Sequence, residues 1–177
     1  MQIKIEEIAE LNVVNFWAEN NFTAEDSPIL FTSENITNKY FPAEIIETSG
    51  AEYCLLCGSL ISLKFTSDFS EYQKYYPLIM AEIDDFFASA EKTFITPKKT
   101  ELSALIEAVA NSLIRPTLLR DKGNIEVAGI ENNNLKIKFT GHCAGCPYAE
   151  KTLNNVITKV IKRHVPQIKN ISLSEQK

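Results

Sequence analysis

The sequence lacks a continuous run of about 18 apolar residues, so it predicts no membrane-spanning helix. It also lacks internal repeats and low-complexity tracts, which gives no sign of a solenoid or of global disorder. Apolar residues make up 45% and charged residues 23% of the 177 residues, as in average globular proteins. The N-terminus has one lysine followed by acidic residues, which matches neither a secretory signal nor an Arg-rich transit peptide. We therefore expect a soluble chain with one large domain or two small ones.

Arginine is absent from residues 1–95, where five lysines face 16 acidic residues and the net charge is −11. Residues 96–177 carry the other 13 basic residues and 7 acidic ones, for a net charge of +6, but few aromatic residues. Two composition classes in one chain predict two domains. In the basic part only Phe139 and Tyr148 are available to stack on bases, so we expect no nucleic-acid binding.

Hydrophobic periodicity predicts an α+β first domain over residues 1–92, with the order β-β-β-α-β-β-α. One helix is expected from Ser33 or Asn35 to Glu47. A longer one is expected from Ser67 or Asp68, with a kink or break at Pro77. The expected strands are residues 3–8, 12–17, 27–31, 51–57 and 60–65.

Residues 93–100 are the expected linker, and residues 101–177 the second domain, with the order α-β-β-α-β. Its first helix should start near Leu102 and end at Arg115-Pro116, because the residue before a proline disfavours helix. The strands are expected around residues 125–127, 135–139 and 171–173, and the second helix around residues 153–161.

A C-x-x-C motif, Cys143-Ala-Gly-Cys146, lies between the strand at 135–139 and the second helix. Pro147 suits the first position of a helix, so both thiols should lie at a helix N-terminus, where the pKa of a thiol falls. Gly141 and Gly145 would let the backbone curl around a bulky inorganic group. The motif therefore predicts an exposed metal or redox site.

Three kinds of chemistry fit this spacing. A structural zinc site needs four ligands, and the other two would come from a second C-x-x-C pair, Cys54 and Cys57, or from His142 and His164. A thiol-disulfide oxidoreductase needs only the two cysteines. An iron–sulfur cluster needs four thiolates, so it would be shared by two chains or would borrow the second pair.

Several separated features resemble, in order, the C-terminal NifU-like domain. They are Arg115-Pro116, Asp121-Lys122-Gly123, the strand running into Gly141-His142-Cys143-Ala144-Gly145-Cys146-Pro147, and Thr152-Leu153. Upstream, residues 27–31, the hairpin after Gly50 and the pair Phe86-Phe87 are similar to the N-terminal domain of Nfu-type proteins. The whole chain therefore resembles an Nfu-type iron–sulfur cluster scaffold or carrier.

This resemblance implies a [4Fe-4S] cluster bound by Cys143 and Cys146 of two chains, which form a homodimer on cluster binding. It implies transfer to apo iron–sulfur client proteins, supply by upstream assembly proteins, and no enzymatic turnover. The location would be the cytoplasm of a bacterium, or the mitochondrial matrix if a presequence has been removed. The alternatives are an oxidoreductase using the same two cysteines and a zinc-stabilised interaction module.

Two positions depart from the family pattern: Lys122 stands where glycine is common, and His142 where a small residue is usual. We expect His142 to be a solvated bystander. Residues three apart on a strand point to opposite faces, so Cys54 and Cys57 cannot both ligate one metal unless the hairpin turn begins at Leu56. We expect at least one of them to be a small core residue.

Overall fold

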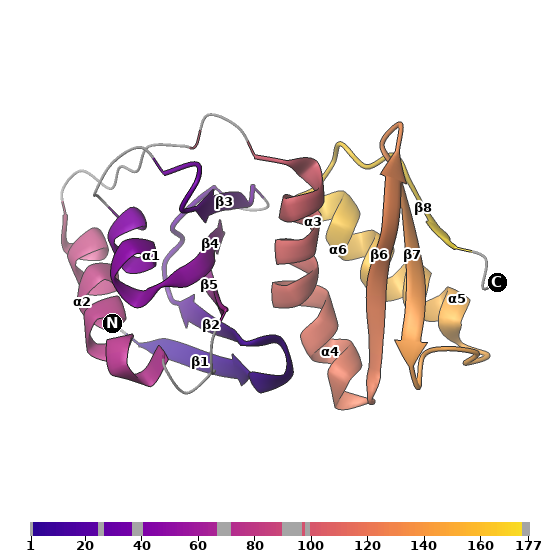
Figure 1. The fold of residues 1–177 in the computed structure, drawn as a ribbon, viewed down its shortest axis with the longest axis horizontal. Coiled ribbons are helices and arrows are strands. Elements are labelled where there is room, and N and C mark those ends of the chain that lie inside the picture. Colours follow the sequence, from indigo (N-terminus) through magenta and orange to yellow (C-terminus); the bar gives the residue numbers. More distant parts are fainter. Residues whose placement is uncertain are drawn as a thin grey trace. The chain divides into compact units, whose positions relative to one another are not determined.

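The computed structural model describes residues 2–24, 27–36, 41–66, 72–89, 97 and 100–174 (Figure 1). The chain divides into two compact units, Met1–Glu101 and Leu102–Lys177. Each unit combines helices with its own β-sheet, which confirms the predicted α+β class. The predicted linker falls almost entirely outside the described residues.

The first unit is built on a five-stranded antiparallel sheet with strand order β1-β2-β5-β4-β3. A short 3-10 turn, Ala9–Leu11, joins β1 to β2, and Gly58 turns the β4–β5 hairpin at φ +57°. Alternating or continuously apolar runs in the sequence predicted all five strands, and each observed end lies within two residues of the predicted one. The strands are β1 (Ile3–Ile8), β2 (Val13–Ala18), β3 (Ile29–Thr32), β4 (Ala51–Cys57) and β5 (Leu60–Phe65).

Two helices, α1 (Ala43–Ser49) and α2 (Tyr72–Ala88), cover one face of this sheet (Figure 1). Burying this face against the helices forms the core of the unit, and each fully buried Leu, Ile or Phe contributes about 1.5–3 kcal/mol. Aromatic rings from separate segments meet there, with Phe41 and Phe86 stacked at 4.5 Å between ring centroids. The core also includes Phe16, Phe31, Ile61, Leu63, Ile79 and Ile83.

The first helix begins later than the sequence predicts. The side chain of Asn35 accepts a hydrogen bond from the Thr32 N–H and donates one to the Leu30 carbonyl, so it stabilises the turn after β3. The described helix α1 begins at Ala43, directly after Pro42, and residues 37–40 of the predicted helix lie outside the described residues. Of the predicted kink or break at Pro77, the break does not occur, because α2 continues through this residue. The predicted start of α2 lies outside the described residues.

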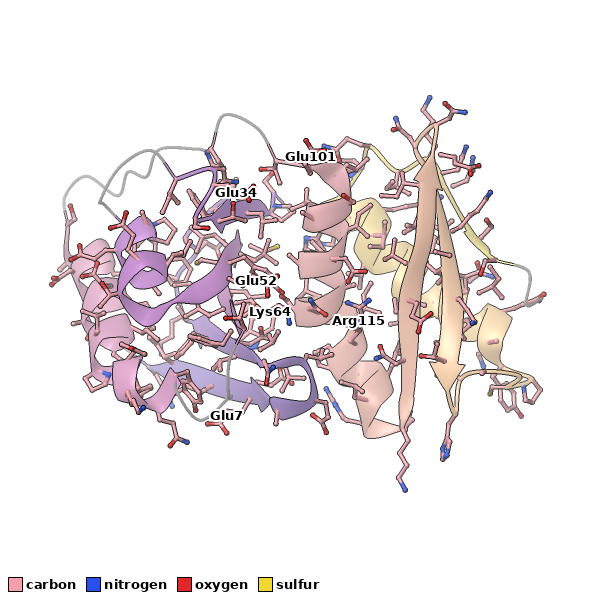
Figure 2. All side chains as sticks on the ribbon, viewed as in Figure 1. Glu7, Glu34, Glu52, Lys64, Glu101 and Arg115 are labelled. Carbon is pink, nitrogen blue, oxygen red and sulfur yellow. The ribbon has the colours of Figure 1, made fainter. Side chains whose placement is uncertain are left out.

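Polar side chains at the rim of the first unit tie strands to neighbouring segments (Figure 2). Lys64 on β5 donates to the Leu11 carbonyl at 3.1 Å and lies 4.0 Å from Glu52 on β4. The hydroxyl of Tyr72, at the start of α2, hydrogen-bonds to Glu7 on β1. These contacts help to hold the sheet edge and the helix to the rest of the unit.

The second unit has a three-stranded sheet with the order β6-β7-β8, formed by β6 (Gly123–Glu131), β7 (Asn134–Gly141) and β8 (Asn170–Leu173). Strands β6 and β7 form an antiparallel hairpin, and β8 pairs with β7 in parallel. Asn132 and Asn133 form the hairpin turn with φ of 49° and 64°, a conformation that asparagine tolerates better than most residues. The predicted order α-β-β-α-β is confirmed.

Each helical segment of this unit contains a π turn. The first runs through α3 (Leu102–Val109), the π turn Ala110–Ile114 and α4 (Arg115–Arg120). The second runs through α5 (Ala149–Thr152), the π turn Leu153–Ile157 and α6 (Thr158–His164). Apolar side chains of the helices and of β6 and β7 form the core. They include Ile106, Val109, Ile114, Leu118, Ile125, Leu135, Ile137, Phe139, Ile157 and Ile161.

The first helical segment does not end at Arg115-Pro116, as the sequence predicts, but continues to Arg120. The π turn directly before Pro116 changes the hydrogen-bond register there, which lets the helix pass a residue that has no N–H. The 19 residues Leu102–Arg120 are long and apolar enough to cross a membrane by length and composition alone, although half of the tested window is buried. Its residues Ile106, Val109 and Ile114 belong to the buried core, as in a core helix.

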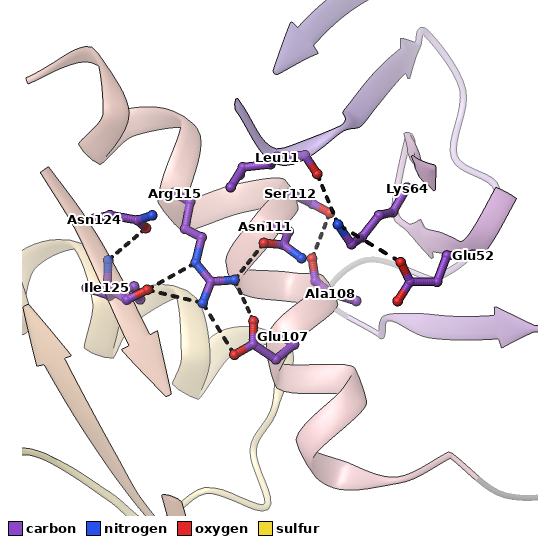
Figure 3. Close-up of polar contacts among 10 residues, drawn as sticks. All are labelled: Leu11, Glu52, Lys64, Glu107, Ala108, Asn111, Ser112, Arg115, Asn124 and Ile125. Carbon is purple, nitrogen blue, oxygen red and sulfur yellow. Dashed lines mark hydrogen bonds and ion pairs between the residues drawn. The ribbon is translucent and has the colours of Figure 1, made fainter. Parts of the chain in front are cut away.

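Arg115 links this helical segment to β6 through a buried hydrogen-bond network (Figure 3). Its Nε and Nη2 donate to the carbonyl of Ile125 at 3.2 and 3.1 Å. Its Nη1 donates to Asn111 Oδ1 at 2.6 Å, and the guanidinium pairs with the Glu107 carboxylate. Arg115 is only 7% exposed, so these partners replace the water that the buried charge loses.

Candidate functional site

The C-x-x-C motif lies on the turn that joins β7 to α5. Backbone hydrogen bonds shape this turn: Ala144 N–H donates to the Gly141 carbonyl at 3.0 Å, and Cys146 N–H donates to the Cys143 carbonyl at 3.3 Å. Gly141 and Gly145 adopt φ of +60° and +74°, a region that favours glycine. These backbone conformations are ones that other residues rarely adopt.

Two glycines facing each other across the β6–β7 pair make room for the turn. Gly123 pairs with Gly141 in the register. A Cβ on Gly123 would lie 2.1 Å from Cys143 Sγ, and one on Gly141 would lie 2.5 Å from the Lys122 carbonyl oxygen. The Cys143 thiol therefore rests directly on the backbone of Gly123.

Lys122, which stands where glycine is common in the family pattern, has a left-handed backbone conformation with φ of 57°. Its carbonyl accepts a hydrogen bond from the His142 N–H at 3.0 Å. The departure from glycine therefore leaves the turn in place, and this turn is hydrogen-bonded to the start of the cysteine turn.

Both thiols are partly exposed, and a shallow pocket of about 250 Å³ adjoins Cys143. The pocket has mostly apolar walls with one cationic side chain. Its lining residues are Lys138, Phe139, Cys143, Gly145, Ala149, Leu173 and Ser174. A group bound to the Cys143 sulfur can therefore reach solvent or another molecule.

The pKa of the Cys143 thiol is raised, contrary to the prediction of a lowered value. Partial burial is the largest cause, and the nearby negative charges of Cys146 and Asp121 add to it. The helix begins only at Ala149, so Pro147 is not its first residue and Cys143 lies well before the N-terminal turn. Metal binding must therefore displace the proton of Cys143, as is usual for thiolate ligands.

The second cysteine pair lies elsewhere in the fold. Cys54 and Cys57 are both buried on β4, and Cys54 belongs to the apolar core of the first unit. Burial raises the pKa of Cys54 far above its usual range, so this thiol stays protonated. The expectation that at least one of the pair is a core residue is confirmed, and both thiols are buried within the first unit.

No group of three or more histidine, cysteine, aspartate or glutamate side chains converges on a possible metal position in the part of the chain that the structure describes. His142 is exposed beside the motif, and His164 ends α6. A zinc site contained in one chain would need four such donors, so the described residues do not support one. The raised pKa of Cys143 also disfavours it as the attacking thiol of an oxidoreductase, which works best with a pKa near the ambient pH.

A family model describes the region that holds this site. Residues 106–172 match the NifU-like domain. This part of the chain is similar to the NifU-like domain. The match covers the whole hairpin β6–β7, the turn with Cys143 and Cys146, and the helical segment behind it.

Longer relatives extend the similarity over both units. The chain is 28% identical over 165 residues to the "NFU1 iron-sulfur cluster scaffold homolog, mitochondrial" of Drosophila ananassae, covering 84% of this chain and 51% of that protein. It is 28% identical over 168 residues to the protein of the same name from Drosophila sechellia, covering 86% and 53%. The resemblance to Nfu-type scaffolds is confirmed, and the chain spans about half the length of these relatives.

The structure adds positioning contacts that sequence reasoning missed around the NifU-like motif. Gly123 supports Cys143, and Arg115 holds the carbonyl of Ile125 two residues further along β6. Both residues belong to the segments that carried the resemblance. The contact of Gly123 depends on pairing between β6 and β7, and that of Arg115 on packing of the helix against β6, neither of which spacing along the chain reveals.

Replacing Gly123 with alanine should weaken binding of a metal or cluster at the predicted ligand Cys143 by about 10- to 100-fold, the usual loss when a residue that positions a ligand is changed. The new Cβ would lie 2.1 Å from Cys143 Sγ, so the thiol must rotate away from its position against Gly123. Iron retention after anaerobic reconstitution measures the effect. Gly129→Ala, on the same strand, is the matched control because a Cβ there meets nothing within 4 Å. Equal retention in both variants would contradict the role of Gly123.

Proposed function

We propose that this protein is an iron–sulfur cluster scaffold or carrier, whose cargo is a [4Fe-4S] cluster held between the C-x-x-C motifs of two copies. The proposal depends on one observation: Cys143 and Cys146 are a partly exposed pair, and no group of three or more possible donors that could hold a metal ion occurs among the described residues. A cluster needs four thiolates as a rule, and two copies supply them. The NifU-like domain and the names of the relatives support the same role.

The surface position of the pair suits delivery to apo-proteins. An acceptor's thiolates can approach a cluster at an exposed turn without unfolding the chain, whereas a buried site would first have to open. Partial burial and neighbouring negative charges favour the protonated form of Cys143, which favours release once the metal bond breaks. Both Drosophila relatives are named mitochondrial proteins, which fits the mitochondrial matrix as the location.

Native mass spectrometry of anaerobically reconstituted protein tests the proposal. We expect a dimer that carries one Fe4S4 unit, together with transfer of that unit to an apo ferredoxin-type acceptor. A monomer with bound zinc would contradict the proposal and indicate a structural metal site. A monomer lighter by two hydrogen atoms would indicate a disulfide and the oxidoreductase alternative.

A further inference from the structure

Strands at the edges of the two sheets differ in how well their backbones are protected. In the described part of the chain, the edge strands are β1 and β3 in the first unit and β6 and β8 in the second. An edge strand presents backbone N–H and C=O groups with which another chain can pair, so folded proteins usually protect it. Of these edges, only that of β8 lacks such protection, so an extended chain can add to the second sheet there.

Side chains protect the other edges in three ways. Strand β1 has three charged side chains among its six residues, and charges on an edge oppose pairing. At β3, the side chain of Asn35 hydrogen-bonds to two backbone groups of the strand. At β6, Arg115 donates two hydrogen bonds to the Ile125 carbonyl, and a β-bulge between Val127 and Gly129 interrupts the regular pairing.

Strand β8 has neither a charged side chain nor a proline, and among the described residues it pairs only with β7 (Figure 1). Three of its four residues are exposed. The Ser174 N–H, directly after the strand, donates to the Ile137 carbonyl on β7 at 2.7 Å. Backbone groups of successive strand residues alternate in direction, so those of Leu173, and of Ile171 two residues earlier, point away from β7. The outer side of β8 therefore offers backbone donors and acceptors to a partner.

This open edge leads to the Cys143 thiol. Leu173, the last residue of β8, and Ser174, directly after it, line the pocket beside Cys143. Strand residues advance by about 3.3 Å each, so a segment of about five residues paired along β8 would extend as far as this pocket. A cysteine near the end of such a segment would lie close to a group bound to Cys143.

Exposed lysines flank the edge at both ends. Lys169 directly precedes β8, and Lys138 lines the pocket at the other end. Lys138 makes no ion pair with a described residue, whereas Lys136 on the same strand pairs with Glu131 at 3.0 Å. Opposite charges across a contact speed association and select the partner. The edge therefore suits an extended segment with acidic residues at its ends and an uncharged centre.

We propose that the outer edge of β8 binds such a segment of a cluster acceptor as an additional strand of the second sheet. This inference rests on the proposed function, which makes Cys143 a ligand of the cluster that is handed over. Backbone hydrogen bonds to Ile171 and Leu173 supply affinity, as in other cases of strand addition, and the lysines supply selectivity. In each exchange one acceptor thiolate bonds to iron and one thiolate of this chain leaves, so no electrons are transferred.

An NMR titration of the full chain without cluster tests strand addition. The probe is a short peptide of alternating threonine and valine with an aspartate at each end. We expect the amides of Ile171 and Leu173 to gain protection from hydrogen exchange, because they face the peptide. The amides of Ser172 and Ser174 face β7 and should change little. The same peptide with a lysine at each end should bind about tenfold more weakly.

Substitutions at the edge make the test specific. Leu173→Pro removes an outward N–H and should weaken binding of the aspartate peptide at least about tenfold. Leu173→Ala keeps this N–H and is the matched control, with binding expected within about threefold of the wild type. Lys138→Glu leaves β8 unchanged and should weaken binding about tenfold, so it keeps the test valid if Leu173→Pro disturbs the sheet. Its control is Lys159→Glu, at an exposed position of α6.

The outcomes separate this inference from the proposed function. Unchanged exchange at Ile171 and Leu173, or equal binding to Leu173→Pro and Leu173→Ala, would overturn strand addition. An excess of the aspartate peptide should also slow cluster transfer to an apo ferredoxin-type acceptor. Unchanged transfer despite peptide binding would show that acceptors dock elsewhere and would overturn the inference. A chain that binds the peptide but never loads a cluster would contradict the proposed function and the acceptor as partner, but not strand addition at β8.

Discussion

Replacing either Cys143 or Cys146 with serine should abolish cluster binding and leave folding almost unchanged. A serine hydroxyl is a poor substitute for a thiolate, and loss of one ligand from each copy removes half of the cluster's ligands. Both side chains are partly exposed on a turn, so we expect the free energy of unfolding to change by less than about 0.5 kcal/mol. Iron and sulfide content after reconstitution measures binding, and urea unfolding measures stability.

The second cysteine pair provides a control, because its substitution should lower stability and leave cluster binding unchanged. Cys54→Ser would bury a hydroxyl in the apolar core of the first unit and should cost about 1–3 kcal/mol. Trp17 on β2 is the only tryptophan, so its fluorescence reports unfolding of that unit. Cluster binding should persist in Cys54→Ser and in Cys57→Ser. Loss of the cluster from folded protein carrying either change would contradict a site formed only by Cys143 and Cys146.

Replacing Arg115 with alanine should destabilise the second unit by about 2–4 kcal/mol. The substitution removes two hydrogen bonds to the buried Ile125 carbonyl and one to the buried Asn111. Glu107 loses its partner too, but its side chain is 42% exposed and water can replace the arginine. Hydrogen exchange of the amides of β6 measures the effect, with the amides of β4 in the first unit as an internal reference.

Two further substitutions make the Arg115 experiment specific. Arg115→Lys should restore only part of the stability, because lysine keeps the charge but lacks the planar fork that reaches several acceptors. Arg120→Ala removes an exposed arginine from the same helix and should change stability by less than about 0.5 kcal/mol. Equal effects of Arg115→Ala and Arg120→Ala would show that the network in Figure 3 contributes little.

The sequence predicts the strands of this protein well because each is set by a local pattern. Residues 60–65 are continuously apolar apart from Ser62 and Lys64, and β5 has those same bounds. In β7, Leu135, Ile137 and Phe139 alternate with lysines and are buried as predicted. A hairpin turn needs only a few residues with the right backbone preference, so local signals suffice there as well.

Helix boundaries are less predictable because tertiary contacts shift them. The π turn at Ala110–Ile114 carries the helix past Pro116, and Arg115 is held there by a strand that comes later in the sequence. Asn35 has the chemistry of a helix cap but stabilises a turn after β3 through two hydrogen bonds. In both cases the local pattern allows several structures, and packing selects one.

The spacing of residues along the sequence identified the candidate site, but it could not predict the pKa of the Cys143 thiol. The C-x-x-C motif and its two glycines lie within residues 141–146 of the sequence. The raised pKa of Cys143 depends on burial and on Asp121, which comes 22 positions earlier and is brought close by the β6–β7 pairing. Spacing predicts which atoms bind a metal, whereas the pKa depends on everything that surrounds them.

The contrast between the two cysteine pairs has a practical consequence. Cys54 and Cys57 are sealed within the first unit, while Cys143 and Cys146 remain accessible. A water-soluble alkylating reagent applied to the folded protein therefore distinguishes the pairs without any mutation. A bound cluster occupies the accessible thiols, so the number of modified cysteines per chain is a direct measure of occupancy. Counting modified cysteines in the unmutated protein therefore measures how much cluster is bound and how much has been released.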